Sequence, residues 1–371
     1  MTPVKDEVKI QMEASGMCHS DHHLVTGDIP MAGFPVLGGH EGAGIVTEVG
    51  PPGVDHIAPG DHVVLSFIPP SCGECPACQE GLRNLCDLGA GLLAGTAVSD
   101  GTYRIHAVKN GQPVIPMTLL GTFSPYMVVH KSSVVKIDPS IPFEVACLVG
   151  CGVTTGYGSA VRSGDVRPGD DVVIVGVGGV GTGALQGALN AGARNVFAVD
   201  PVEFKRDNAL KFGATHAYPP DIFSAMAGVA EVTQGRMAHK TIVTVGELKG
   251  EDIDHYMNIT AKGGTVVATA VANMASNDVK LNLSMLTLLQ KRLQGTIFGG
   301  GNPHHDIPQL LSMYKAGRLN LDDMVTRQYK LEQINDATPT CWRAATSAVS
   351  SATRTPIAEC DFGALTCEDR G

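Results

Sequence analysis

Hydrophobic and polar positions change their pattern along the chain. In residues 1–150, glycine and proline interrupt nearly every apolar run, and the β-branched runs Gly44–Val49 and His62–Phe67 are short, as strands are. From about residue 153 to 297, β-branched runs alternate with Ala/Leu-rich segments. This alternation of strand and helix predicts a parallel, doubly wound sheet of the α/β class. The segments that carry it are DDVVIVGV, GTGALQGALNAG, NVFAVD, EFKRDNALKFG, KTIVTVG and GGTVVATAV.

The last part of the chain departs from this alternation. The segment Ile307–Leu319 repeats apolar positions three and four residues apart and predicts a helix. Residues 338–371 follow neither the helical nor the strand period, so no element is predicted there. We expect four regions: a β-rich domain over 1–152, the doubly wound domain over 153–297, a return to the first domain over 298–337, and an atypical tail over 338–371.

The composition narrows the classes of protein. Hydrophobic residues make up 43% of the chain and charged residues 17%, which excludes a disordered polypeptide. The net charge of −10 offers no basic face to a nucleic acid. The longest apolar stretch, Val172–Val180, is far shorter than the roughly 20 residues of a membrane span, and the N-terminus lacks an apolar signal segment. A cytoplasmic protein is therefore expected.

Four of the ten cysteines form a cluster with the spacing of a metal site. Disulfides are rare in a reducing compartment, so clustered cysteines indicate metal ligands or catalytic thiols. Four thiolates with two-residue gaps and a glycine and proline in the loop can surround one tetrahedral zinc ion, and they fill all its positions. The alternative is a redox CxxC pair. The four residues of this predicted structural zinc site are Cys72, Cys75, Cys78 and Cys86.

Three further segments carry metal-ligating residues beside glycines: GMCHSDHH, GGHEGAG and GCGVTTGYG. Cys18, His40 and Cys151 together would make a Cys₂His set, which leaves a fourth zinc position open for water or an alcohol. Taken singly, a histidine or a buried cysteine is more often a structural residue. The prediction of a second, catalytic zinc ion rests on the three together.

A glycine-rich loop with the dinucleotide fingerprint follows a predicted strand. Gly176 permits the tight turn, Gly178 lets the backbone approach a pyrophosphate, and Gly181 allows close packing of helix on strand. The next predicted strand ends at Asp200, where a carboxylate can hold ribose hydroxyls and repel a 2′-phosphate, which favours NAD over NADP. Lys205 follows, and it either lies near phosphate or adenosine or begins a solvated helix.

These motifs together resemble the zinc-dependent medium-chain alcohol dehydrogenases. The resemblance runs from about residue 6 to 337 and rests on GMCHSDHH, GGHEGAGIV, the four-cysteine loop, GCGVTTGYGSA and VGVGGVG. It implies a GroES-like β-barrel catalytic domain, with a Rossmann domain inserted before a returning C-terminal segment. It also implies that Cys18, His40 and Cys151 hold a catalytic zinc ion, so that we expect two zinc ions and one NAD per chain.

The resemblance implies roles for further residues. Glu41 corresponds to the acid beside the catalytic zinc ion, and Ser20 and His23 occupy the positions of a proton relay. His19 matches a basic position near the pyrophosphate, and Thr155 matches a position beside the nicotinamide. The complete set of expected cofactor-binding positions is His19, Thr155, Gly176, Gly178, Gly179, Val180, Gly181, Asp200, Lys205 and Val271.

Longer stretches resemble one branch of that family, the actinobacterial nicotinoprotein alcohol dehydrogenases that depend on N,N-dimethyl-4-nitrosoaniline. They include MCHSDHHLVTGDIPMAGFPVLGGHEGAGIV and LQGTIFGGGNPHHDIPQLLSMYKAGRLNLDDMV. The branch implies oxidation of a small-molecule alcohol by hydride transfer to tightly bound NAD, in a homo-oligomer. Two alternatives stay open: a thiol-adduct formaldehyde dehydrogenase, with Arg104 and Lys109 as candidate anchors for the thiol's carboxylates, and a non-catalytic zinc-binding remnant.

Both ends of the chain differ from the family pattern. Family members begin some two dozen residues earlier, so N-terminal strands are expected to be missing. At the other end, a DNA sequence can be written that encodes Thr340–Val349. Translation of the same DNA from its third base gives Met-Leu-Ala-Gly-Arg-Asn-Ile-Arg-Gly, the family's usual ending. We therefore hypothesise that residues 338–371 are translated out of frame.

Overall fold

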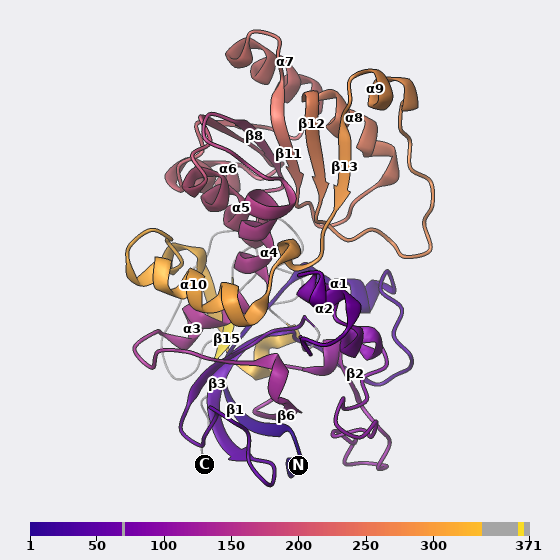
Figure 1. The fold of residues 1–371 in the computed structure, drawn as a ribbon, viewed down its shortest axis with the longest axis vertical. Coiled ribbons are helices and arrows are strands. Elements are labelled where there is room, and N and C mark those ends of the chain that lie inside the picture. Colours follow the sequence, from indigo (N-terminus) through magenta and orange to yellow (C-terminus); the bar gives the residue numbers. More distant parts are fainter. Residues whose placement is uncertain (69–70, 336–362, 367–371) are drawn as a thin grey trace. The chain divides into compact units, whose positions relative to one another are not determined.

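The computed structural model describes residues 1–68, 71–335 and 363–366. The chain divides into two compact units, which we describe separately (Figure 1). The first comprises Met1–Gly152 and Asn302–Gly371, and the second comprises Val153–Gly301. No helix in the described part of the chain combines the length and the apolar character needed to cross a lipid bilayer.

The first unit is built on a seven-stranded, mainly antiparallel sheet in the order β14-β15-β1-β3-β4-β7, with β6 also paired to β1. Alternate side chains of β1 are buried, and Val8, Ile10 and Met12 enter the core of this unit. The strands are β1 (Glu7–Gly16), β3 (Glu41–Val49), β4 (His62–Leu65), β6 (Tyr126–His130), β7 (Val134–Lys136), β14 (Arg327–Tyr329) and β15 (Gly363–Thr366); β2 (Val36–Leu37) and β5 (Ile115–Pro116) form a separate pair.

The described residues of the first unit include four α-helices. The helix α1 starts directly after Cys18 and ends where Gly27 takes a left-handed conformation, with φ of 82°. The predicted helix near residue 307 is present and begins four residues earlier, at Pro303. The helices are α1 (His19–Thr26), α2 (Pro76–Gln79), α3 (Phe143–Ala146) and α10 (Pro303–Lys315).

The second unit contains a six-stranded parallel sheet in the order β10-β9-β8-β11-β12-β13. Numbered within the unit this is 3-2-1-4-5-6, the order of a Rossmann dinucleotide-binding fold. Its strands are β8 (Asp171–Val175), β9 (Asn195–Val199), β10 (His216–Tyr218), β11 (Ala238–Val243), β12 (Thr260–Ala268) and β13 (Arg292–Gly295), and its helices are α4 (Gly152–Gly158), α5 (Gly179–Asn190), α6 (Glu203–Lys211), α7 (Ile222–Thr233), α8 (Ile253–Asn258) and α9 (Leu283–Leu288).

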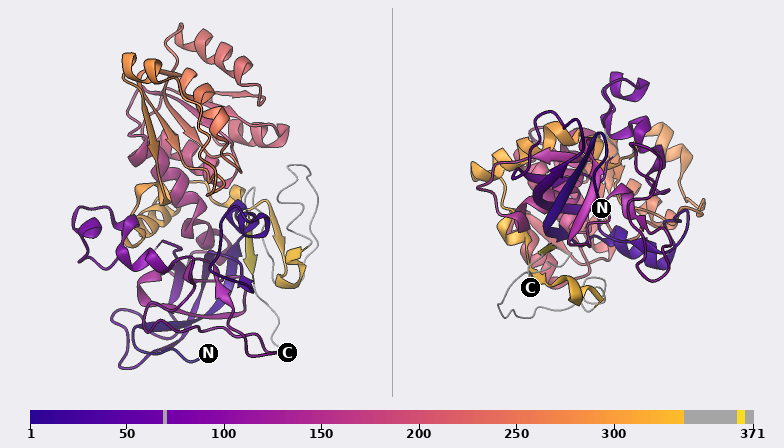
Figure 2. Two further views of the ribbon diagram at one scale, coloured as in Figure 1. Left: turned by 90° about the vertical axis from the view of Figure 1, so that its right-hand side faces the viewer. Right: turned by 90° about the horizontal axis from the view of Figure 1, so that it is seen from below.

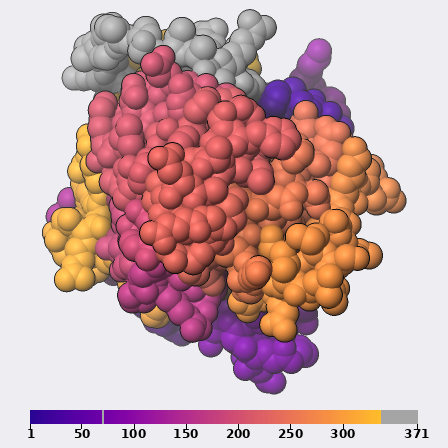
Figure 3. Space-filling model, turned by 90° about the horizontal axis from the view of Figure 1, so that it is seen from above, coloured from indigo at the N-terminus to yellow at the C-terminus, as the bar shows by residue number. Residues whose placement is uncertain are grey.

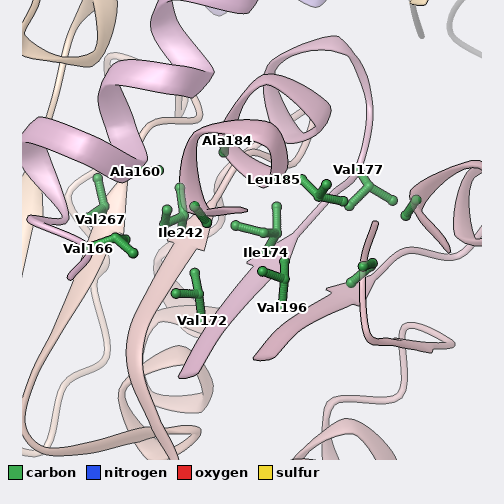
Figure 4. Packing of buried hydrophobic residues seen from close by; sticks show 14 residues of the cluster. Ala160, Val166, Val172, Ile174, Val177, Ala184, Leu185, Val196, Ile242 and Val267 are labelled. Carbon is green, nitrogen blue, oxygen red and sulfur yellow. The ribbon is translucent and has the colours of Figure 1, made fainter. Parts of the chain in front are cut away.

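Helices cover both faces of this parallel sheet (Figure 2). On β8, Val172 and Ile174 pack with Leu185 of α5, as Figure 4 shows. The intervening Val173 packs in a second cluster with Val229 of α7. Burial on both faces explains the continuous apolar runs of these strands. The expected fold class, a GroES-like domain with a doubly wound Rossmann sheet, is confirmed.

One strand of the first unit lies in the atypical tail. Gly363–Thr366 form β15, which pairs antiparallel with β1 and parallel with β14. The sequence predicts no element there, because a four-residue segment has too little pattern to reveal a strand that depends on pairing with distant residues. The other residues of the hypothesised out-of-frame tail, 338–362 and 367–371, lie outside the described part of the chain.

Candidate active site and metal centres

The four clustered cysteines converge on one point in the first unit. Their sulfur atoms lie within 4.8 Å of one another. The Cys72 and Cys78 sulfurs are 4.0 Å apart, close to the ~3.8 Å edge of a tetrahedron with Zn–S distances of ~2.3 Å. Pro76 begins the short helix α2 just after Cys75, and this turn brings Cys78 back toward Cys72. The geometry fits one tetrahedral zinc ion.

The electrostatics of the cluster also call for a cation. Backbone N–H groups of Glu74 and Cys75 donate to the Cys72 sulfur at 3.4 and 3.3 Å and lower the pKa of that thiol to about 7. Burial raises the pKa of the Cys86 thiol to about 12, and the neighbouring thiols add to the effect. Four negative sulfurs cannot coexist at this spacing unless a positive ion compensates them. A divalent zinc ion would supply that charge.

A second group of metal-binding side chains lies in the same unit. Cys18, His40, Glu41 and Cys151 each offer one ligand atom, and these atoms lie within 4.8 Å of one another. The ligands come from separate elements: Cys18 precedes α1, His40 and Glu41 lie at the start of β3, and Cys151 follows a 3₁₀ turn. The structure therefore brings together all three residues predicted to hold the catalytic zinc ion, and Glu41 with them.

The ionisation of this group matches a cation site as well. The pKa of the Cys18 thiol is well below its usual value, because the thiol contacts Cys151 and lies near the charge of His40. Burial opposes ionisation of His40, but Asp21 and Cys18 outweigh it and raise the pKa of the imidazole well above its ordinary value. Without a metal ion, a proton thus compensates the thiolate charge. A zinc ion held by two thiolates and a neutral imidazole would replace that proton.

Asp21, which the sequence did not single out, holds this site together. Its Oδ2 lies 3.5 Å from Nδ1 of His40, and its two carboxylate oxygens accept N–H groups of Gly39 at 2.7 Å and Cys18 at 3.1 Å. A carboxylate behind a metal-ligating histidine fixes the ring orientation and makes the ligand more basic. In the sequence, Asp21 is only an acid in the first turn after Cys18, and an acid at that position is equally typical of a residue that caps a helix.

Glu41 is buried, with 2% of its surface exposed, and its carboxylate lies among the ligand atoms. Burial, strengthened by the charge of Cys18, raises its pKa well above the ordinary value. The side chain fits because Gly16 has no Cβ: a Cβ there would lie 2.3 Å from Glu41 Oε2. Glu41 is thus in reach of the metal position, as the family resemblance implies, although its role there is still a prediction.

The two residues predicted for the proton relay lie one turn apart on α1. Ser20 Oγ is 3.6 Å from the Cys18 sulfur, so it borders the metal-binding group. His23 is buried, with 2% of its side chain exposed, and its Nδ1 lies 3.0 Å from Asp28 Oδ2. The ring of His19 meets the ring of His23 edge-on, with centroids 5.1 Å apart. The spacing of three residues puts Ser20 and His23 on one side of the helix.

The glycine loop of the second unit lies between β8 and α5. Gly176 has φ of 85°, and a Cβ on Gly181 would lie 1.9 Å from the carbonyl oxygen of Gly176. Gly178 is the N-cap residue of the 12-residue helix α5. Because glycine has no side chain, the N-cap residue makes no side-chain hydrogen bond to the first N–H groups of the helix. Such a helix start binds phosphate through N–H groups and the helix dipole. Gly179 and Val180 form its first turn.

Asp200 follows β9 beside this loop. It is 3% exposed, and its carboxylate accepts the Val177 N–H at 2.9 Å and the Val202 N–H at 2.9 Å. Thr244, at the end of β11, donates its hydroxyl to the Gly176 carbonyl at 2.5 Å. β8 and β11 are neighbours where the strand order reverses, which is where such sheets bind ligands. Thr244 was not predicted, because nothing in the sequence links it to the loop.

The remaining predicted cofactor positions are also in the second unit. Thr155 is buried in α4, Lys205 lies in the first turn of α6, and Val271 follows β12. Arg206 donates to the carbonyls of Asp200 and Pro201, which fixes the chain after β9. The cofactor roles of these residues are predictions.

Known proteins share both units. Residues 4–139 match the alcohol dehydrogenase GroES-like domain, and residues 179–316 match the zinc-binding dehydrogenase family. Alcohol dehydrogenase B of Mycobacterium tuberculosis is 78% identical over 334 residues, which cover 90% of this chain and 88% of that protein. The chain belongs to the zinc-binding, medium-chain alcohol dehydrogenases.

Two further proteins are less similar to this chain. The NDMA-dependent alcohol dehydrogenase of Amycolatopsis methanolica is 48% identical over 90% of this chain and 88% of its own length. The crystal structure of an alcohol dehydrogenase zinc-binding domain protein from Burkholderia ambifaria matches with a TM-score of 0.83 and 30% identity, covering 91% of this chain and 89% of that one. The expected resemblance to the family is therefore confirmed.

Within this alcohol dehydrogenase scaffold, one candidate anchor for a thiol substrate is already occupied. Arg104 pairs with Glu7 at 2.7 Å and with Asp100 at 2.9 Å, and Glu7 is 1% exposed. The guanidinium therefore attaches its loop to β1 and serves as a structural group. Lys109 is exposed on the same loop. Of the two candidate anchors of the thiol-adduct alternative, Arg104 is thus engaged in ion pairs within the chain.

Proposed function

We propose that this alcohol dehydrogenase oxidises an alcohol to an aldehyde or ketone with NAD as hydride acceptor, and that each chain holds two zinc ions. The observation that carries the proposal is the buried convergence of Cys18, His40 and Cys151 beside Glu41. Three protein ligands leave a position for the substrate, whereas the four-cysteine group fills every position of its ion. The site of Cys18, His40 and Cys151 is therefore assigned to catalysis, and the four-cysteine site to structure.

The chain's own residues have separable tasks. Cys18, His40 and Cys151 hold the zinc ion, which when bound polarises the alcohol oxygen as a Lewis acid. Asp21 orients His40 through the contact at Nδ1. Ser20 Oγ and His23 lead the alcohol proton away from the metal position, since a hydroxyl both accepts and donates a proton and an imidazole can accept a proton on one ring nitrogen while it carries hydrogen on the other. Glu41, buried beside the ligands, keeps a carboxyl oxygen within their reach.

NAD is proposed as the cofactor because of the second unit. The uncapped start of α5 supports binding of the pyrophosphate, and the Asp200 carboxylate supports binding of ribose hydroxyls and rejection of a 2′-phosphate. When bound, NAD supplies the hydride acceptor. Because the Amycolatopsis relative is named NDMA-dependent, we further propose that NAD stays bound here and that a separate acceptor takes up the electrons.

A measurement of cofactor content tests this function. The purified protein is denatured, and the released NAD(H) and zinc are quantified per chain. We expect about one NAD(H) and two zinc ions, the numbers of sites described, together with alcohol-dependent reduction of NDMA without added NAD. If no NAD(H) is released and the protein shows no turnover with added NAD, the protein is instead the non-catalytic zinc-binding remnant. A requirement for a low-molecular-weight thiol would instead favour the thiol-adduct reaction.

We also propose that the protein is a homo-oligomer formed through the free edge of β13. Among the described residues, β13 ends the parallel sheet, and its four residues are exposed. Exposed apolar side chains, which we call the patch, lie on α9, on β13 and just after β13, in the part of the chain drawn orange in Figure 3: Leu283, Met285, Leu288, Leu293 and Ile297. An unpaired edge beside exposed leucines can pair with the same edge of a second copy through two-fold symmetry.

The oligomer is tested by placing a charge in this patch. Leu288, with 77% of its surface exposed, is not needed for packing within the chain, so Leu288→Glu should leave the fold intact. We expect light scattering to report a shift from dimer or larger to monomer. Phe223→Glu is the matched control, because Phe223 is 65% exposed on a different helix, α7. An unchanged mass for Leu288→Glu would exclude this interface.

A further inference from the structure

His23 is paired with an acid that no motif pointed to. Asp28 Oδ2 lies 3.0 Å from His23 Nδ1, with 2% of the histidine side chain and 18% of the aspartate side chain exposed. A carboxylate this close accepts a hydrogen from Nδ1, so the ring carries its first proton on that nitrogen. Asp28 also accepts a hydrogen bond from the Thr26 hydroxyl, which restrains the carboxylate.

The end of α1 places the Asp28 carboxylate beside Nδ1 of His23. Gly27 adopts a left-handed conformation, and this lets the chain turn back. The N–H groups of Gly27 and Ile29 both donate to the His23 carbonyl, at 3.1 and 3.2 Å. Asp28 lies between these two anchored residues, so its position relative to His23 is determined by the backbone. A turn held from both sides is a rigid support for a side-chain contact.

We propose that Asp28 is a positioning residue of the proton relay, which keeps His23 protonated on Nδ1 so that Nε2 takes up and releases the alcohol proton. This inference rests on the proposed alcohol oxidation. A proton that reaches Nε2 gives an imidazolium whose Nδ1–H remains donated to Asp28, and the same proton then leaves from Nε2 to solvent. Asp28 itself takes up no proton, and it stabilises the transient positive charge.

A double-mutant cycle separates this role from simple stabilisation of the turn. Asp28→Asn, His23→Gln and the double variant are compared in single-turnover oxidation of an alcohol. We expect each single variant to slow the reaction roughly 10- to 100-fold, and the double variant to be no slower than His23→Gln alone, because Asp28 acts through His23. Multiplying losses would overturn the proposal. If the parent protein oxidises no alcohol, the proposed function itself fails.

A second readout does not depend on turnover. ¹⁵N chemical shifts of the His23 ring report which nitrogen carries hydrogen. We expect hydrogen on Nδ1 in the parent protein and a mixture of both tautomers in Asp28→Asn, with unchanged zinc content. Thr26→Val is the matched control, since it removes the hydrogen bond from Thr26 to Asp28 and leaves the contact of Asp28 with His23. An Asp28→Asn spectrum identical to that of the parent would overturn the proposal.

Discussion

Replacing Cys151 by alanine is expected to lower alcohol oxidation by at least about a thousandfold, because an incomplete ligand set loses the ion that activates the alcohol. The same variant should keep one zinc ion per chain, since the four-cysteine group shares no ligand with the site of Cys151. Metal analysis and steady-state kinetics on the same preparation measure both effects. Full activity in Cys151→Ala would contradict the assignment of the catalytic site.

Two further variants control this experiment. Cys147 lies four residues before Cys151, is completely buried and stands outside the ligand group, so Cys147→Ala should retain both zinc ions and most activity. Cys86→Ala should lose the other ion and destabilise its loop, because structural zinc contributes directly to folding. A Cys147→Ala variant that lost zinc as Cys151→Ala does would show that packing around the site had been disturbed.

Gly181→Ala is expected to lose at least about 100-fold in affinity for NAD, because an added Cβ would collide with the Gly176 carbonyl and displace the phosphate-binding turn. Calorimetric titration with NAD of protein stripped of cofactor measures this loss. Part of the effect will appear as a lower melting temperature, because the same contact packs α5 against β8.

The control for Gly181→Ala is a glycine at which an added Cβ would have no atom within 4 Å. Gly91 has open space around it and no left-handed backbone, so Gly91→Ala should bind NAD like the parent protein. The zinc content should stay at the parent level in both variants, because the ligands belong to the first unit. Parent-level NAD affinity in Gly181→Ala would remove the loop from the cofactor site.

The elements with a strong local period could be predicted from the sequence. Strands β8, β9, β11 and β12 contain the predicted β-branched runs, helices α5 and α6 lie in the predicted Ala/Leu-rich segments, and α10 lies where the apolar spacing predicts a helix. The short helix α1 has a polar, histidine-rich sequence with no long period, so it escaped prediction. Edge strands such as β10 and β13 depend on a neighbour already being in place, and local patterning does not reveal them.

The metal-binding groups could be predicted because their chemistry limits the choice of residue. Cysteine and histidine beside glycine recur in few contexts, and the structure brings each predicted group together. Three further residues were not predicted, because each acts on a site residue through a hydrogen bond or an ion pair: Asp21, Asp28 and Thr244. Any acid or threonine in the sequence could make such a contact, so residue type alone does not identify them. Only the positions of their partners in space distinguish them.

The interrupted first unit has a consequence for synthesis on the ribosome. The second unit is one continuous segment and can fold as soon as it has emerged, whereas the sheet of the first unit needs β14 and β15 from the far end of the chain. All the ligands of both metal-binding groups precede residue 152, however. We therefore expect that both groups can take up metal ions before residues 153–301 have been translated.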